Sequence, residues 1–113
     1  MARLRDPESG CPWDLKQDFK SIAPCAIEET YELVNAIDNN DIENMREELG
    51  DVLLQVVFHA QMAKEQNLFT FDDVVEGIVH KLISRHPHVF GEETAVTPDD
   101  VMKIWGSVKQ KEK

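Results

Sequence analysis

Basic residues are scarce in this sequence: 12 lysines and arginines stand against 22 aspartates and glutamates among 113 residues, giving a formal net charge of −10. Proteins that bind duplex nucleic acid neutralise its phosphates with clusters of lysine and arginine. The shortage therefore argues against a duplex nucleic-acid binder. An anionic ligand would need metal ions or a local basic patch. The length suits one domain with a real core and is short of two.

Cysteine and long apolar runs are scarce as well. Cys11 and Cys25 are the only cysteines, and they form no CxxC pair. This favours a reduced, cytoplasmic setting, with a single disulfide left open. Residues 1–6 carry no apolar signal core, and the most apolar run, at 52–60, contains two polar residues and is far too short to span a bilayer. We expect no membrane anchor.

The sequence also lacks the motifs of several enzyme classes. It contains no glycine-rich phosphate loop, internal repeat or low-complexity tract. No serine or cysteine stands beside a base in the manner of a covalent nucleophile. The Glu-x-x-His pairs of di-iron carboxylate bundles are missing too, which makes that class the weaker reading of any carboxylate site.

Acidic residues are concentrated in the first half of the chain. Residues three or four apart share one face of a helix. Two pairs have this spacing on consecutive predicted helices: Glu29 with Glu32, and Glu48 with Asp51. If the helices are antiparallel, four carboxylates face one another and repel unless a cation lies between them. Mg²⁺ takes such oxygen ligands and keeps water or phosphate in its other positions. The alternative is a solvated acidic face.

Helical periodicity separates the members of this cluster. Glu29 lies at the flank of the apolar stripe of its helix, whereas Glu28 points nearly opposite that stripe. Glu29 is therefore the better ligand and Glu28 the better solvated residue. Asp51 is in register with Leu54 and Phe58, which predicts that its carboxylate faces inward, where it needs a partner.

The apolar pattern predicts an all-α protein, an antiparallel bundle of four to five helices. An irregular arm at residues 1–16 precedes a helical domain at 17–113. The expected helices are a short turn at 16–21 and long segments at about 24–37, 41–66, 71–85 and 98–110. Prolines 24 and 98 mark two of the expected starts, and Asp41 is the expected N-cap of the second long helix.

The second long helix is apolar on two sides. One stripe contains Leu49, Leu53, Val56 and Ala60, and the other contains Leu54, Phe58 and Met62. Three other helices of one small chain cannot readily cover both stripes. We therefore expect a homodimer or a higher homo-oligomer in which a second subunit completes the bundle.

Five segments of the chain carry a family resemblance: residues 4–7 (Leu-Arg-Asp-Pro), 10–14 (Gly-Cys-Pro-Trp-Asp), 28–32 (Glu-Glu-Thr-Tyr-Glu), 48–51 (Glu-Leu-Gly-Asp) and 85–90 (Arg-His-Pro-His-Val-Phe). Taken together, these segments resemble the MazG family of nucleoside triphosphate pyrophosphohydrolases, within the all-α NTP pyrophosphatase superfamily. The resemblance covers nearly the whole chain as a single MazG-like domain, and the chain is similar to the first of the two copies that long members hold.

The resemblance implies Mg²⁺-dependent hydrolysis of nucleoside triphosphates to a monophosphate and pyrophosphate, a house-cleaning reaction of the nucleotide pool. It implies Mg²⁺, with Mn²⁺ as an alternative, as the cofactor. The metal ligands and catalytic residues that it implies are Glu29, Glu32, Glu48 and Asp51, with Glu28 as a further candidate ligand.

The resemblance also implies substrate-binding residues on the last two long helices: Lys81, Arg85, Trp105 and Lys109. Without it, Lys81 and Arg85 would be read as complementing a helix dipole or reaching solvent, and Trp105 as core. A non-catalytic domain that binds nucleotide or metal for regulation or assembly remains the alternative function.

Overall fold

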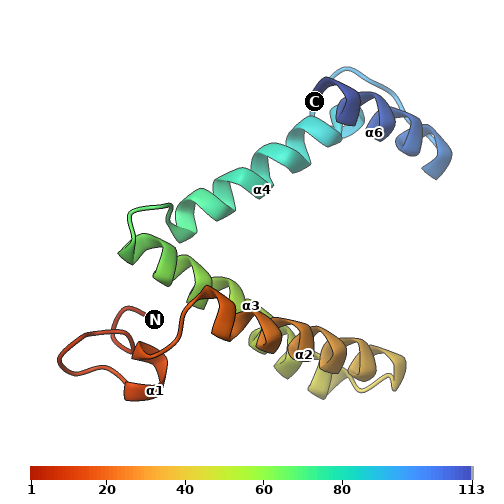
Figure 1. Cartoon of the computed structure of the whole chain (residues 1–113). Helices are drawn as coiled ribbons and strands as arrows, with labels where there is room; N and C mark the ends of the chain where they lie inside the picture. Colours follow the sequence, from red (N-terminus) through yellow and green to blue (C-terminus); the bar gives the residue numbers. More distant parts are fainter. Residues whose placement is uncertain (113) are drawn as a thin grey trace. The chain divides into compact units, whose positions relative to one another are not determined.

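The computed structural model describes residues 1–112 and contains two compact units: unit 1, Met1–Phe71, and unit 2, from Asp72 onward (Figure 1). All regular structure in residues 1–112 is helical, which confirms the all-α prediction. Unit 1 holds α1 (Pro12–Leu15), α2 (Phe19–Asp38) and α3 (Ile42–Glu65); α4 (Phe71–Arg85) begins at the boundary, and α5 (Pro87–Phe90) and α6 (Pro98–Glu112) follow it. The single turns α1 and α5 lie in segments that were expected to be irregular.

Helix α2 begins earlier than predicted. The backbone N–H of Ser21 donates to Oδ1 of Asp18 (2.8 Å), and the N–H of Asp18 donates to Oγ of Ser21 (2.8 Å). This capping box starts the helix at Phe19 and places Pro24 inside it. The expected turn at 16–21 and the expected helix at 24–37 are therefore one continuous helix, because the capping box is the stronger start signal.

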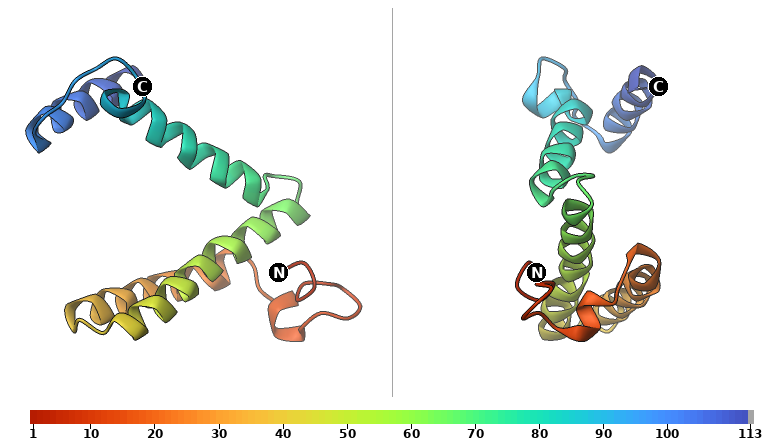
Figure 2. Two further views of the ribbon diagram at one scale, coloured as in Figure 1. Left: turned by 180° about the vertical axis from the view of Figure 1, so that it is seen from behind. Right: turned by 60° about the vertical axis from the view of Figure 1, so that its left-hand side comes forward.

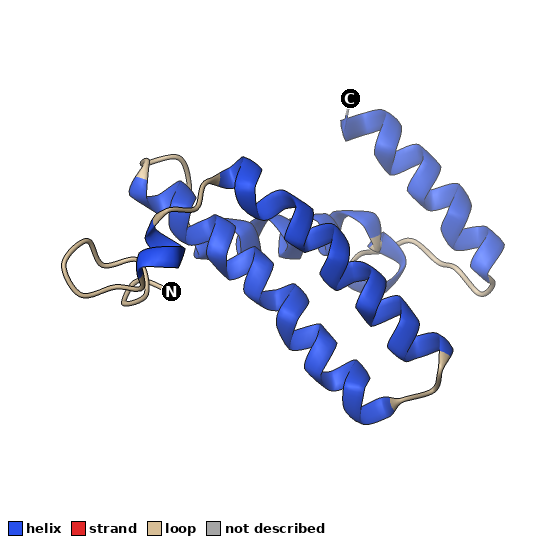
Figure 3. Cartoon of the chain, turned by 60° about the horizontal axis from the view of Figure 1, so that its bottom comes forward, coloured by secondary structure: helices blue, strands red, loops and turns tan. Residues whose placement is uncertain are grey.

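Helices α2 and α3 lie side by side as an antiparallel hairpin (Figures 2 and 3). Residues 39–41 join them, with Asn40 in the left-handed region at φ 54°. The N–H of Asn44 donates to Asp41 (3.1 Å), which confirms the predicted N-cap of α3. On each helix, buried or half-buried residues recur about every three or four positions, and we call these two series the inner stripes: Ile22, Cys25, Ala26, Glu29, Leu33 and Ala36 on α2, and Met45, Glu48, Val52, Gln55, His59 and Met62 on α3. Outside the α3 series, Phe58, Ala60 and Ala63 are also buried.

Arg5 fastens the N-terminal arm to α3. Its Nε donates to Oε2 of Glu65 (2.8 Å), and its Nη1 donates to the carbonyl oxygens of Asp14 and Gln17. The guanidinium also lies 5.7 Å from the ring centroid of Phe58, a cation–π distance. These contacts close the arm over the C-terminal half of α3.

The buried core of unit 1 lies under this arm. Phe58 and Met62 are 4% and 1% exposed and pack with Ile22, Met1 and Phe19. The arm and the start of α2 therefore cover Phe58 and Met62, two members of the second apolar stripe of α3, within the chain. The expected homodimer stays a prediction, which the single chain does not test. Leu53 and Leu54 remain 55% and 45% exposed in the single chain.

In unit 2, a few side-chain contacts join the C-terminal end of α4 to α6: Ser84 and Arg85 hydrogen-bond to Glu112, and the ring of His86, which follows α4, lies 5.5 Å from that of Trp105. Thr97 and Asp100 cap α6, because the N–H of Asp100 donates to Oγ1 of Thr97 (3.2 Å) and the N–H of Thr97 donates to Oδ2 of Asp100 (3.2 Å). The expected start at Pro98 is confirmed. None of the helices in residues 1–112 is long and apolar enough to cross a bilayer.

Candidate metal centre

Three carboxylates from α2 and α3 come together inside the hairpin. Glu29, Glu48 and Asp51 each place one oxygen within 4.8 Å of the others. Glu29 lies midway along α2, and the other two lie in the first half of α3. The antiparallel pairing of the helices thus joins residues that are about twenty positions apart in the sequence.

The carboxylates of the cluster repel one another. Desolvation raises the pKa of Glu29 above its ordinary value, and the negative charges of Glu32 and Asp51 raise it further. Desolvation likewise raises the pKa of Glu48, and the negative charge of Glu32 is again the largest like-charge effect. Glu32 therefore belongs to the same electrostatic cluster, although it lies outside the group of three close oxygens. Glu28 is exposed, as predicted, and is the smallest of the influences named for Glu29.

Two oxygens of the cluster have no hydrogen-bond donor. Oε2 of Glu29 and Oε2 of Glu48 are shielded from solvent, and no donor in residues 1–112 reaches them. No ion pair found in this part of the chain involves the cluster. Shielded carboxylate oxygens without a partner are costly, and a hard divalent cation accepts this type of donor set. The residues therefore fit a Mg²⁺ or Mn²⁺ ion.

Asp51 departs from the prediction that it faces away from water. It is exposed in the single chain, as is Leu54 one turn later. The reason is that the N-terminal arm covers this face of α3 at Phe58 and Met62 but does not extend to Asp51. Periodicity identified the correct face, whereas the cover over that face comes from residues far away in the sequence.

The predicted substrate-binding residues all lie in unit 2. Arg85 Nε and Trp105 Nε1 are shielded and have no acceptor in residues 1–112. Lys81 and Lys109 are exposed. Arg85 is partly engaged, because its Nη2 donates to Oε2 of Glu112 (3.3 Å).

His88 also has a shielded ring nitrogen without a partner, and the sequence did not identify it as a site residue. Its Nδ1 is shielded and unpaired within the described residues. The His86 ring lies 5.4 Å from the His88 ring and 5.5 Å from Trp105, the latter in an edge-on arrangement. The sequence showed a proline turn here and one of the segments that carry the family resemblance, but it assigned no role to His88. A histidine three positions after Arg85 gives no spacing signal of its own.

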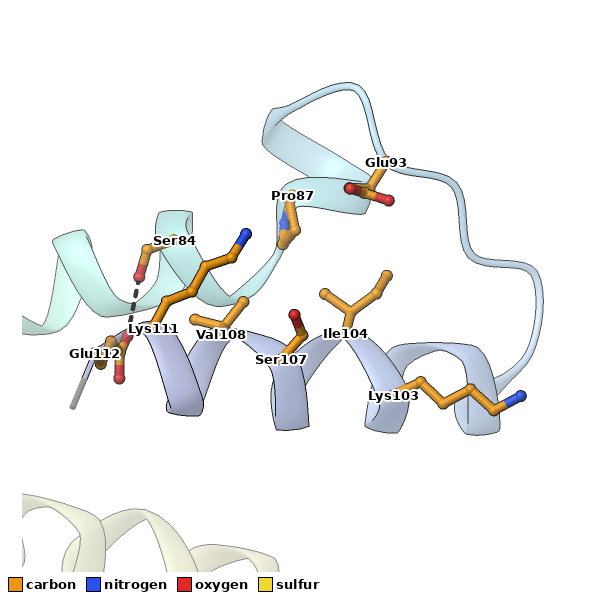
Figure 4. Close-up of a pocket in the computed structure, with 9 residues that line it drawn as sticks. All are labelled: Ser84, Pro87, Glu93, Lys103, Ile104, Ser107, Val108, Lys111 and Glu112. Carbon is orange, nitrogen blue, oxygen red and sulfur yellow. Dashed lines mark hydrogen bonds between the residues drawn. The ribbon is translucent and has the colours of Figure 1, made fainter.

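A hollow of about 530 Å³ lies elsewhere in unit 2, between α6, the end of α4 and α5 (Figure 4). Ile104 and Val108 form an apolar part of its wall, and Lys111 extends across it. None of Lys81, Arg85, Trp105 or Lys109 lines this hollow. It therefore does not coincide with the predicted substrate residues.

Comparison with known proteins found a matching family model and similar sequences. Residues 17–90 match the model of the MazG nucleotide pyrophosphohydrolase domain. The whole chain is 50% identical to a nucleoside triphosphate pyrophosphohydrolase of Escherichia coli (strain K12), of which it covers 43%. It is 53% identical to the nucleoside triphosphate pyrophosphohydrolase/pyrophosphatase MazG of Thermotoga maritima, of which it covers 42%.

A solved structure gives the same picture of the fold. The crystal structure of a MazG-related protein from Thermotoga maritima matches 88% of this chain and 87% of its own, with a TM-score of 0.75 and 28% sequence identity. The chain spans less than half the length of the two curated relatives that it matches.

Proposed function

The chain belongs to the MazG nucleotide pyrophosphohydrolase family, and we propose on this basis that it hydrolyses nucleoside triphosphates to a monophosphate and pyrophosphate with a divalent cation. The observation that carries the proposal is the carboxylate cluster with its two shielded, unpaired oxygens, on Glu29 and Glu48. Such a cluster of like charges inside a small hairpin is destabilising unless a cation binds to it. The relatives that carry this activity in their names support the choice of reaction.

In this proposal Glu29, Glu48 and Asp51 hold Mg²⁺, or Mn²⁺, with Glu32 adding a fourth carboxylate. A divalent cation bound there supplies charge that offsets the phosphates and lowers the pKa of a bound water. Glu28 stays in solvent as an outer member. Water adds to the α-phosphorus, the bond from that phosphorus to its bridging oxygen breaks, and pyrophosphate leaves.

Unit 2, considered by itself, carries groups that can bind an anion. The shielded nitrogens of Arg85 and Trp105 are donors that lack acceptors, and phosphate or base oxygens are acceptors. Lys81 and Lys109 add mobile positive charge. The Arg85 to Glu112 contact is given up when a phosphate takes the place of that carboxylate.

A homodimer, a cytoplasmic setting and a house-cleaning role complete the proposal. Leu53 and Leu54 expose an apolar area that a second copy would cover, and a two-fold interface covers both copies with one surface. Cys11 and Cys25 are both free thiols, as a reducing compartment requires.

The test is direct. The purified chain is incubated with a mixture of ribo- and deoxyribonucleoside triphosphates and Mg²⁺, and pyrophosphate is assayed, with EDTA and with Glu29→Gln as controls. Pyrophosphate that depends on both Mg²⁺ and Glu29 supports the proposal. Nucleotide binding without pyrophosphate release would assign the alternative, a non-catalytic regulatory or assembly domain. Stoichiometric iron in the purified protein would overturn the Mg²⁺ reading in favour of a di-iron site.

A further inference from the structure

Unit 1 contains a third shielded oxygen besides those of Glu29 and Glu48. Oε1 of Gln55 is inaccessible to solvent, and no donor in residues 1–112 reaches it. Gln55 is one of the two polar residues that interrupt the apolar run at 52–60. The three unpaired oxygens all belong to inner-stripe residues of the α2–α3 hairpin.

Gln55 lies on the same side of α3 as the carboxylates. It is four residues after Asp51 and seven after Glu48, so it stands one and two helical turns from them, roughly 6 and 10 Å along the axis. Its neighbours on the inner stripe of α3 are Val52 and His59. This position places the amide inside the hairpin, beside the carboxylate cluster.

Residues 1–112 offer no substitute partner for this amide oxygen. The ring of His59 is the nearest polar group on the stripe, but its Nδ1 is 2.7 Å from the backbone carbonyl of Gln55 and donates there. An apolar residue at position 55 would continue the stripe without leaving an acceptor unpaired. A shielded acceptor without a donor is costly, so a donor from outside the chain accounts best for glutamine here.

We propose that Gln55 is a positioning residue of the cation site, with Oε1 accepting a hydrogen bond from the hydration water of the divalent cation held by Glu29, Glu48 and Asp51. This inference rests on the proposed function. Mg²⁺ keeps several waters when a few carboxylates hold it, and those waters are strong donors. Groups that accept hydrogen bonds from the ligands of a metal ion hold those ligands in place and tune the affinity of the site for the metal. A neutral acceptor adds this effect without further like-charge repulsion.

The experiment measures cation affinity without nucleotide, by calorimetry for Mg²⁺ and by electron paramagnetic resonance for Mn²⁺. Gln55→Leu is compared with Gln61→Leu, a matched control on the same helix whose amide donates to Glu65 instead (3.3 Å). We expect Gln55→Leu to weaken cation binding about tenfold or more and Gln61→Leu to leave it unchanged. We also expect Gln55→Leu to raise the melting temperature of the metal-free protein, because the unpaired oxygen is gone.

Cation affinity and melting temperature together distinguish a positioning role of Gln55 from a purely structural one, because loss of packing would lower both the cation affinity and the stability. If Gln55→Leu does not fold, Gln55→Glu is compared with Gln61→Glu, and we expect clearly tighter Mg²⁺ binding only in the former. Wild-type Mg²⁺ affinity in Gln55→Leu, or equal effects at positions 55 and 61, overturns this inference alone. Absence of Mg²⁺ binding by the unchanged protein overturns the proposed function instead.

Discussion

Glu29 on α2 and Glu48 on α3 hold like charges together inside one helical hairpin, with an oxygen of each within 4.8 Å of the other. Both have a raised pKa, and desolvation is the largest cause in each case. In the metal-free protein this pair opposes the pairing of α2 with α3. A bound cation reverses the sign of that contribution.

The stability of the metal-free protein should therefore increase on mild acidification. A carboxyl whose folded pKa is raised binds more protons in the folded state than in the unfolded state, in the range just above the ordinary value of about 4.3. Stability falls as pH rises through that range and recovers as pH falls. The lowered pKa values of Asp6, Glu65 and Asp100 act in the opposite sense, but only below their ordinary values.

Thermal unfolding in EDTA, followed by circular dichroism from pH 7.5 down to about pH 5, measures this dependence. The Glu29→Gln variant is the control, and its profile should be flatter because one of the raised groups is gone. A wild-type melting temperature that falls steadily with acidification across this range would contradict the electrostatic account of the cluster.

Removing one carboxylate charge should abolish turnover without unfolding the protein. We expect Glu29→Gln and Asp51→Asn each to lower the rate of pyrophosphate release about 100-fold or more, since each variant loses one ligand of the cation site, the first on α2 and the second on α3. The metal-free melting temperature should rise, because like-charge repulsion decreases. Glu28→Gln, at an exposed position on the same helix, is the matched control and should keep most of the activity. Full turnover in either cluster variant would remove the site.

The reaction should release AMP and pyrophosphate from ATP, with no ADP. When the reaction runs in H₂¹⁸O, mass spectrometry should find the label in AMP, because water adds to the α-phosphorus in the proposed reaction. Label in pyrophosphate would move the attack to the β-phosphorus. Orthophosphate as the first product would rule out pyrophosphohydrolysis.

Glu112 should compete with the substrate for Arg85. Its carboxylate lies 3.3 Å from the guanidinium, and both side chains are about one third exposed. An exposed ion pair contributes little, so we expect Glu112→Gln to lower KM for the triphosphate only about two- to fivefold. Arg85→Ala should raise KM by about tenfold or more, because a charge-assisted phosphate contact is lost.

Glu92→Gln is the control for this comparison, because Glu92 is an exposed glutamate of the same unit without an observed partner. It changes net charge by the same amount and should leave KM unchanged. Equal shifts in KM for the Glu92 and Glu112 variants would show that general charge, and not the contact with Arg85, is responsible.

The exposed apolar residues of α3 should mediate self-association. Light scattering at micromolar concentration should give at least twice the chain mass, and Leu53→Glu should reduce it while the chain stays helical. Phe58→Glu should unfold unit 1 instead, because Phe58 is buried under the arm. A stable, active monomer of the unchanged chain would contradict the dimer.

Sequence reasoning located the helices well where one signal dominated. Asp41 capped α3 and Pro98 opened α6 as expected. It failed at Pro24, because a capping box between Asp18 and Ser21 acts earlier and the helix continues through the proline. When two start signals lie close together, as the capping box and Pro24 do here, neither signal by itself shows where the helix begins.

The sequence predicted which helix faces carry the site residues, but it did not predict how exposed each of these residues is. The spacing of Glu48 and Asp51 placed both on one side of α3, and the structure brings both to Glu29. The exposure of Asp51 depends on where the N-terminal arm ends, and the shielding of Gln55 depends on α2. Residues far away in the sequence provide this cover, and the periodicity of one helix gives no information about them.

The fastening of the arm by Arg5 has a practical consequence for handling the protein. The carbonyl of Met1 accepts from the N–H of Arg5 (3.0 Å), and the Met1 side chain packs on the core beside Phe58 and Met62. A protease that clips the arm would remove this cover and expose core residues to neighbouring molecules. Aggregation of such a preparation would report the loss of the arm and not a weakness of the helices beneath it.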